Sequence, residues 1–188
     1  LNDNIMISPN ALDERLIFNK ALNDNAHDEK IKEKHSVVKE EERLIIGYMG
    51  TPTHDRDFLE ILPALKHTLQ KYRGKIRFEV VGSLYNKSLL NLLPYTTQRD
   101  PRGYVEYTQF WSWMKQNIHW DLAVAPLEKN EFTDCKSDIK YLDYTALGIP
   151  GLCTQCPAYE KTVISGKAGI LVENKTNNWV EAIELLIH

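Results

Sequence analysis

Two lysines, a serine and an aspartate lie close together in one short stretch, around the point where a helix is expected to begin. Lys136, Ser137 and Lys140 follow an apolar run and a polar loop, and the helix is predicted to open near Ser137. The dipole and free amides of a helix N-terminus favour anions. Asp143 lies one turn further on and shares a helix face with Lys140. The stretch therefore predicts a site for a ligand that carries both phosphates and sugar hydroxyls.

Each of these side chains also has a simpler interpretation. Lys136 and Lys140 are four residues apart and repel each other by roughly a few tenths of a kcal/mol, which fits either an anion between them or plain exposure to solvent. Asp143 could form a salt bridge with one of the lysines and do nothing more. Asp138, between the lysines, is interpreted only as a partner of the helix dipole.

A second polar loop, residues 50–57, follows an earlier apolar run. Gly50 allows the backbone to approach a ligand closely, and Arg56 brings a permanent charge. Thr51 and His54 lie between them and are further candidates for ligand binding. The loop contains neither GxGxxG nor GxxxxGK[ST], so it predicts no nicotinamide fingerprint and no Walker A site. The alternative is an ordinary turn that an aspartate caps.

Strand and helix patterns alternate from residue 43 onward, and these elements must position both loops. Apolar runs of strand length cover residues 44–49, 76–81, 103–107, 121–125, 149–153 and 169–172. Helical spacing covers residues 58–72, 88–93, 108–116, 137–148, 158–165 and 177–187. The alternation predicts an α/β fold, a doubly wound Rossmann-like parallel sheet of about six strands with helices on both faces. The two loops would then face each other where the strand order reverses.

The composition is that of one globular domain. The chain has 188 residues, of which 43% are hydrophobic and 26% charged, enough for a full core. A net charge of -3 argues against a broad basic surface for nucleic acid. The apolar runs are too short to span a membrane, and no signal-peptide pattern opens the sequence.

Cysteines and aromatic residues have structural interpretations that we prefer. The odd cysteine count, three, fits a reducing compartment better than a disulfide framework. Cys153 and Cys156 have CxxC spacing, but no second pair completes a zinc site, so no metal is predicted; a redox pair at a helix start is the alternative. Thr108 is expected to cap a helix whose aromatic stretch, residues 110–113, packs in a core or interface rather than stacking on bases or sugars.

Two longer motifs resemble the C-terminal domain of a GT-B glycosyltransferase, most of all the retaining family four (glycosyl transferases group 1). They are KSDIKYLDYTALGIPGLCT and YEKTVISGKAGILVENKTNNWVEAI. The family shows an acid, an Ala-x-Gly-x-Pro turn and later a Gly-x-Leu-Val strand, and Asp143, residues 146–150 and residues 169–172 stand in those places. SPNALD, near the start, resembles the interdomain segment that usually reads PNGVD. The resemblance covers nearly the whole chain.

The resemblance implies how a nucleoside-diphosphate sugar would be held. In the family, two glutamates eight positions apart grip the donor, the first near the sugar and the second at the ribose. Asp143 occupies the second place. Cys135 occupies the first, where a thiol cannot replace a carboxylate that hydrogen-bonds a sugar hydroxyl. Asp134 or Glu131 could serve instead from a shifted loop.

The resemblance also implies a mechanism. When the nucleoside diphosphate leaves, charge develops on its phosphate oxygens. Arg56 and Lys140, together with Lys136 and the amides near Ser137, would stabilise that charge in place of a metal ion. Neither a cofactor nor a divalent ion is therefore expected.

The implied domain plan places this chain in a larger protein. Residues 1–42 would be an interdomain linker and a polar segment, and residues 43–188 the donor-binding domain. An N-terminal acceptor domain in cis is missing, so the isolated domain is expected to be inactive. The implied function is a cytoplasmic, hexosyltransferase-like step of polysaccharide biosynthesis, which moves a sugar to a glycan or lipid-linked acceptor with retention. Contact with the inner face of a membrane would come through the missing half.

Three rival functions are weighed against this one. Cys135 at the first acid position favours a degenerate, non-catalytic nucleotide-binding or scaffold domain of GT-B type. A sugar epimerase would need a different acidic pattern, and a phosphorylase would need a cofactor lysine that the sequence does not reveal. The missing glycine fingerprint disfavours a nicotinamide oxidoreductase. The base of the donor is expected to contact backbone near Gly82 and residues 104–107.

Overall fold

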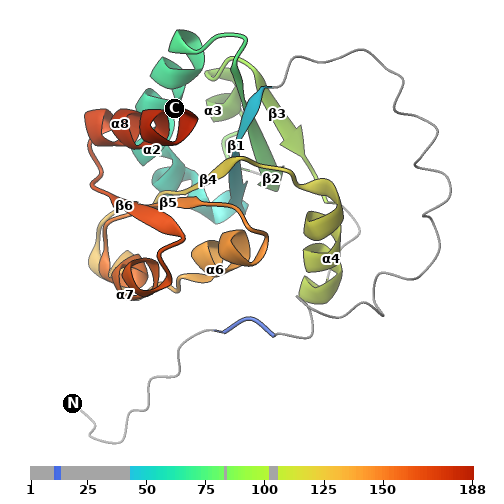
Figure 1. The fold of residues 1–188 in the computed structure, drawn as a ribbon, viewed down its shortest axis with the longest axis vertical. Helices are drawn as coiled ribbons and strands as arrows, with labels where there is room; N and C mark the ends of the chain where they lie inside the picture. The colour runs from blue at the N-terminus through green and yellow to red at the C-terminus, as the bar shows by residue number, and fades with distance from the viewer. Residues whose placement is uncertain (1–10, 14–42, 83, 102–105) are drawn as a thin grey trace, which may run out of the picture.

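The computed structural model describes residues 11–13, 43–82, 84–101 and 106–188. Within them, one sheet has the strand order β3-β2-β1-β4-β5-β6, and every neighbouring pair is parallel. The strands are β1 (Leu44–Gly50), β2 (Ile76–Gly82), β3 (Thr96–Arg99), β4 (Leu122–Ala125), β5 (Gly151–Thr154) and β6 (Gly169–Val172). The predicted six-stranded parallel sheet is confirmed (Figure 1).

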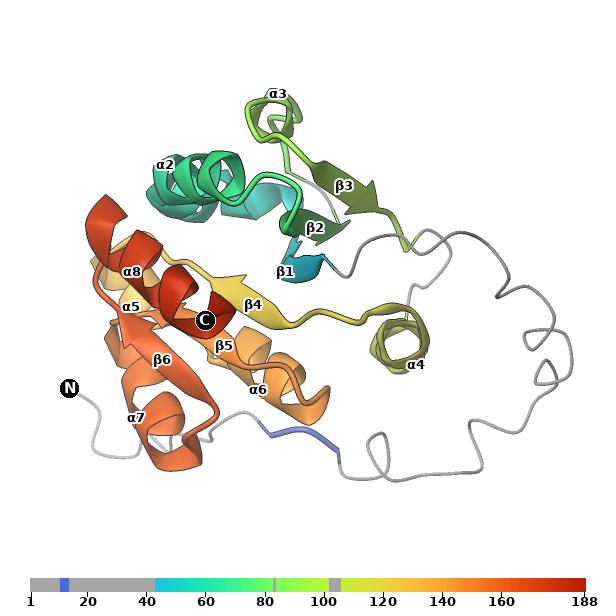
Figure 2. The ribbon, with the colours of Figure 1, turned by 45° about the horizontal axis from the view of Figure 1, so that its top comes forward.

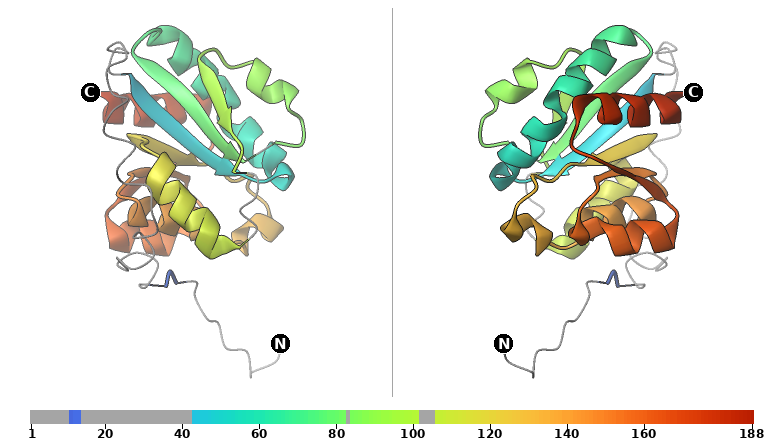
Figure 3. Two further views of the ribbon diagram at one scale, coloured as in Figure 1. Left: turned by 90° about the vertical axis from the view of Figure 1, so that its right-hand side faces the viewer. Right: turned by 90° about the vertical axis from the view of Figure 1, so that its left-hand side faces the viewer.

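Helices connect the strands and cover both faces of the sheet. They are the 3-10 turn η2 (Pro52–His54), α2 (Asp55–Lys71), α3 (Ser88–Asn91), α4 (Tyr107–Asn117), α5 (Glu131–Asp134), α6 (Ile139–Ala146), α7 (Pro157–Gly166) and α8 (Thr176–Ile187). Figure 2 shows α2 on one side of the sheet, and α4 and α6 on the other. Figure 3 shows α8 beside α2, across the front of the sheet in its right-hand view. The arrangement is a doubly wound α/β fold.

The core consists of two buried clusters, one on each face of the sheet. Strand β4 contributes to both, because successive side chains of a strand point to opposite faces. Leu122 and Val124 pack in the cluster with α2 and α8, whereas Ala123 and Ala125 pack in the cluster with α6 and α7. A strand covered on both faces is apolar at every position, which is why the sequence reveals it.

The aromatic stretch of α4 packs against the protein, as predicted. Trp111 is only 2% exposed, and the rings of Phe110 and Trp113 stack with their centroids 6.4 Å apart. Both of these partly buried rings border the second core cluster. The N-cap of this helix is Glu106, so the prediction that Thr108 caps it is wrong.

The third strand is not where the sequence pattern predicted it. Of the predicted range, residues 103–105 lie outside the described residues, and Tyr107 begins α4 instead. The third strand is β3, with the polar sequence TTQR, and it lies at the edge of the sheet beside β2. An edge strand buries little surface, so it needs no apolar run. The short helix α5 also falls in a segment that was predicted as a loop.

Helix α6 begins at Ile139, two residues after the predicted start, and ends at Ala146. Gly148 then turns the chain with φ of 75°, a conformation that glycine adopts without strain. No helix in the described part of the chain is long and apolar enough to cross a membrane. The predicted linker and polar segment, residues 1–42, lie outside the described residues except for positions 11–13.

Candidate functional site

The loops after β1 and β4 meet at the C-terminal edge of the sheet, where the strand order reverses. β1 pairs with β2 on one side and with β4 on the other, an arrangement that opens a crevice beyond the strand ends. Asp57, in the first turn of α2, accepts a hydrogen bond from the Glu128 amide at 2.9 Å and one from Lys136 Nζ at 3.1 Å. The two predicted loops are therefore in direct contact.

Asp57 is a buried carboxylate that bonds to side chains from both loops. It is 3% exposed, and His54 Nδ1 lies 2.6 Å from its Oδ2 atom. Burial alone would raise the pKa of Asp57, but the hydrogen bonds from His54, the Glu128 amide and Lys136 lower it to about 2. Asp57 is thus ionised at neutral pH and ties the β1 loop to the β4 loop.

Lys140 is a buried cation in the first turn of α6. It is 8% exposed, and its Nζ atom has no hydrogen-bond partner among the described residues. The ring of Tyr48 lies beside it, with its centroid 5.1 Å from Nζ. Burial lowers the pKa of Lys140 from its ordinary 10.5 to about 8. A charged ammonium is unfavourable in such a place, so an anion that reached it would be bound strongly.

The N-terminus of α6 adds backbone donors beside Lys140. The N-cap residue, Asp138, makes no side-chain cap; its carboxylate instead accepts a hydrogen bond from Thr162 Oγ1 at 2.5 Å. The first-turn amides of α6 are therefore left without a side-chain cap, and the positive end of the helix dipole lies here. Ser137, which was predicted to contact the ligand, is exposed just before this turn.

Lys136 supplies a second charge from the segment between β4 and α6. Its Nζ atom bonds to Asp57 and lies 5.6 Å from the centroid of the Phe132 ring. The preceding helix α5 has a reciprocal capping box, in which the side chains of Asn130 and Thr133 each accept from the other's amide. This cap orders a segment that would otherwise be an open loop, and so holds Lys136 in place.

Asp143 is buried and bonded to an element that sequence reasoning did not connect with it. It is 2% exposed, and Tyr107 at the start of α4 donates a hydrogen bond to its Oδ1 atom at 2.5 Å. Burial raises the pKa of Asp143 to about 6, against the opposing effect of the Tyr107 hydrogen bond. The salt bridge to Lys136 or Lys140 considered as an alternative is not formed.

The three candidates for the first acid position are all exposed: Cys135, Asp134 and Glu131. Glu131 and Asp134 line a hollow of about 430 Å³ beside Cys156 and Glu160, away from the contacts of Asp57. Thus no carboxylate in this segment contacts Lys136 or Lys140.

The β1 loop contributes less than its sequence suggested. Arg56 is exposed in the first turn of α2 and makes no ion pair within the described residues. Thr51 is exposed; its hydroxyl lies 3.1 Å from that of Thr53, and its carbonyl oxygen accepts a hydrogen bond from the His54 amide. Gly50 packs against the Tyr48 ring, whose hydroxyl would lie 2.7 Å from an added Cβ atom. Of the candidates in this loop, His54 alone bonds to Asp57, the residue that contacts the β4 side.

Sequence reasoning missed Asp57 and Tyr48, and it named residues 104–107 only for backbone contacts with the base, not for the Tyr107 hydroxyl. A signal existed for Asp57, because it follows His54 by three positions at a helix start and such residues share a face. Nothing in the sequence indicated Tyr48 or the Tyr107 hydroxyl. The expected backbone contacts of the base near residues 104–107 fall largely outside the described residues.

The two cysteines with CxxC spacing lie in the second core cluster. Cys153 and Cys156 are free and buried, and burial raises the pKa of both thiols, which keeps them in the unreactive thiol form at neutral pH. Within the described ranges, no group of three or more His, Cys, Asp or Glu side chains could hold a metal ion.

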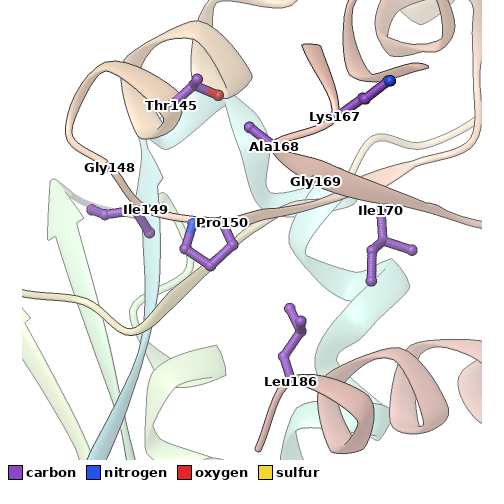
Figure 4. A pocket seen from close by; sticks show the side chains of 9 residues that line it. All are labelled: Thr145, Gly148, Ile149, Pro150, Lys167, Ala168, Gly169, Ile170 and Leu186. Carbon is purple, nitrogen blue, oxygen red and sulfur yellow. The ribbon is translucent and has the colours of Figure 1, made fainter. Parts of the chain in front are cut away.

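A different hollow lies between α6, β6 and α8. It has a volume of about 360 Å³, and Figure 4 shows its lining of Thr145, Gly148, Ile149, Pro150, Lys167, Ala168, Gly169, Ile170 and Leu186. Gly148 precedes β5 and Gly169 begins β6, so this hollow borders the N-terminal ends of these strands, opposite the crevice. Its lining is mainly aliphatic and has no cluster of charges suited to a phosphate.

Comparison with known proteins gives one family match. A family model described as "Glycosyl transferases group 1" matches residues 43–188. No curated protein matches the chain by sequence.

Solved structures share the fold at low sequence identity. WaaG, a glycosyltransferase involved in lipopolysaccharide biosynthesis, is 14% identical with a TM-score of 0.57, over 78% of this chain and 38% of that one. The C-terminal domain of LpcC from Francisella tularensis, a glycosyl transferase group 1 family protein, is 18% identical with a TM-score of 0.56, over 77% and 75%. An E. coli trehalose-6-phosphate structure bound with UDP-2-fluoro glucose is 11% identical with a TM-score of 0.54, over 78% and 36%. The chain thus spans less than two fifths of the first and third of these proteins.

Proposed function

Because the chain belongs to the glycosyl transferases group 1 family, we propose that it binds a nucleoside-diphosphate sugar in the crevice between the β1 and β4 loops. Lys140 carries this proposal: it is buried, has no partner among the described residues, and lies in the first turn of a helix without a side-chain cap. A diphosphate would supply the negative charge that this place lacks. The fold relative that holds UDP-2-fluoro glucose makes uridine nucleotides the first to test.

In the proposed reaction, the bond between the anomeric carbon and the diphosphate breaks. Negative charge then develops on the phosphate oxygens, and Lys140, Lys136 and the first amides of α6 would stabilise it. Asp143 would accept hydrogen bonds from the ribose hydroxyls once the Tyr107 hydroxyl has moved aside. Arg56 stays a candidate for a further charge from the exposed start of α2. No step requires a metal ion.

The activity of the whole protein is a further part of the proposal. We propose a hexosyltransferase-like reaction that places the sugar, with retention, on a glycan or lipid-linked acceptor bound by a second domain. The low coverage of the WaaG chain, 38%, supports a larger active protein. On this view the 188 residues alone bind donor and transfer nothing, and any membrane contact is made by the second domain.

One observation favours a second candidate function. Cys135 is exposed, and no acid of its segment contacts the crevice lysines. A domain that has lost the grip on the sugar could serve as a non-catalytic nucleotide sensor or a scaffold.

Titration calorimetry of the chain separates these cases. We expect one of the UDP, GDP, ADP or dTDP sugars to bind, to be displaced by inorganic pyrophosphate, and to bind far less well after Lys140→Met. NAD serves as the control ligand for the disfavoured oxidoreductase. If none of the nucleotide sugars binds, the donor-binding proposal is wrong and the scaffold is favoured. Transfer to acceptors by the chain alone would contradict the two-domain proposal.

A further inference from the structure

Asp57 binds no ligand directly in this arrangement, because the protein already occupies both of its oxygen atoms. Oδ1 accepts the Glu128 amide, whereas Oδ2 lies 2.6 Å from His54 Nδ1 and 3.1 Å from Lys136 Nζ. Only 4% of the side chain is exposed. A buried carboxylate whose two oxygen atoms are both held by these loops acts on a ligand through the groups that it holds.

The contact with Asp57 fixes the hydrogen position on the His54 ring. Hydrogen bonds to Asp57 keep the pKa of its carboxyl group at about 2, so it carries no proton near neutral pH and can only accept. His54 Nδ1 must therefore be the ring nitrogen that bears hydrogen. The other nitrogen, Nε2, has no hydrogen-bond partner among the described residues, and the side chain is 20% exposed. In the neutral ring, Nε2 offers a bare lone pair.

A bound diphosphate would add negative charge to a set of groups that carries both signs. The charged groups on the elements that meet here are Asp55, Arg56, Asp57 and Glu60 of α2, Glu128 after β4, and Lys136 and Lys140 beside α6. Lys136 bonds to Asp57 Oδ2, the same oxygen that lies beside His54 Nδ1. The oxygens of a bound diphosphate would repel a bare lone pair on His54 and attract an N–H donor.

We propose that Asp57 is a positioning residue that directs His54 and Lys136 toward the diphosphate of the donor, and that His54 takes up one proton at Nε2 when the donor binds. The proton comes from solvent, and the resulting imidazolium donates from Nε2 to a phosphate oxygen and from Nδ1 to Asp57. The inference rests on the proposed function, since it assumes that a nucleoside-diphosphate sugar enters this crevice.

Proton-linked calorimetry tests this inference on the whole chain. The probes are UDP-glucose, GDP-mannose, ADP-glucose and dTDP-glucose, whose diphosphate diesters do not titrate near neutral pH. The sugar that binds is titrated at pH 7.5 in two buffers of different ionisation enthalpy. We expect net proton uptake by the unaltered chain. His54→Gln should bind roughly tenfold more weakly and lose most of the uptake. The remaining uptake belongs to Lys140, whose pKa of about 8 leaves it partly unprotonated at this pH.

Nitrogen NMR of the His54 ring gives a readout that a purely structural role would not move. The unaltered chain should show hydrogen on Nδ1, and Asp57→Asn should shift the ring toward the Nε2–H form and reduce proton uptake. Asp55→Asn is the matched control, because it removes a carboxylate two residues away that accepts from the Tyr85 and Asn86 amides instead. The control should keep both the tautomer and the uptake.

The outcomes separate this inference from the function on which it rests. Binding without proton uptake, or hydrogen on Nε2 in the unaltered free chain, overturns the inference and leaves donor binding intact. A chain that binds none of the four sugars overturns both. Equal effects of Asp57→Asn and Asp55→Asn on the tautomer would show that Asp57 has no positioning role.

Discussion

Replacing Lys140 by methionine should make the protein more stable and the proposed donor site weaker. Methionine keeps most of the side-chain volume beside Tyr48 and removes the charge. The two effects have opposite signs, so together they distinguish a binding residue from a structural one. A residue retained for stability would lose both stability and binding when it is replaced.

The size of the stability effect follows from burial. The pKa of Lys140 falls from 10.5 to about 8, and a change of one in pKa corresponds to about 1.4 kcal/mol. Keeping the ammonium charged at neutral pH therefore destabilises the fold by about 3 kcal/mol. The attraction between Nζ and the Tyr48 ring, with the centroid at 5.1 Å, recovers about 1 to 2 kcal/mol. The free energy of unfolding should thus rise by about 1 to 2 kcal/mol in the methionine variant.

The gain should depend on pH in a defined direction. Between about pH 8 and 10.5, the unfolded chain keeps the Lys140 proton and the folded chain releases it, so the unaltered protein gains stability as pH rises. The methionine variant has no such gain, and its advantage should shrink by pH 9.5. All other titrating groups are present in both proteins, so the difference between the two proteins reports mainly on Lys140.

Urea unfolding at pH 7 and pH 9.5 measures this difference, and calorimetry with the bound nucleotide sugar measures the affinity. Removing one member of a buried ion pair costs about 3 to 5 kcal/mol. The affinity of the Lys140→Met variant for the nucleotide sugar should therefore fall at least about a hundredfold. Lys66→Met, at an exposed position of α2, is the control and should change neither quantity. A destabilised Lys140→Met protein with unchanged affinity would refute the reasoning.

Two further predictions concern the second acid and the sheet. Asp143→Asn should raise the free energy of unfolding by up to about 2 kcal/mol at pH 7, because burial raises the folded pKa to about 6 from 3.8. The unaltered chain loses this stability as pH rises from 4 to 6. The same variant should bind UDP more weakly but pyrophosphate equally well. An equal loss of affinity for both ligands would place Asp143 away from the ribose. Gly47→Ala should destabilise by about 1 to 3 kcal/mol in urea, since its Cβ would lie 1.8 Å from the Trp120 ring; a negligible loss would mean that this ring moves freely.

The buried parts of the fold could be predicted from the sequence because burial leaves a pattern. Strands covered on both faces are continuously apolar, and β6 (Gly169–Val172) has the bounds that its apolar run predicted. β3 (Thr96–Arg99) was missed because an edge strand with a polar sequence leaves no such pattern. Helix starts were misplaced by one to three residues, since the observed N-caps of α4 and α6 use no side-chain hydrogen bond.

The site was predicted by type of residue rather than by contact. The two lysines and the crevice followed from the helix start and the strand order, but Lys136 meets Asp57 across 79 residues of sequence. No local pattern indicates such a pairing. Burial of Lys140 against Tyr48 depends on how α6 packs on the sheet, and exposure of Arg56 depends on the angle at which α2 leaves η2. Both are tertiary properties that spacing alone does not encode.

Mapping the binding of UDP by amide chemical shifts tests the central claim most directly. The account predicts that the largest changes fall on Gly50, His54 and the first turn of α6, with no change at Gly148 and Gly169 in the aliphatic hollow. Changes confined to that hollow, or none at saturating UDP and the other nucleoside diphosphates, would contradict it.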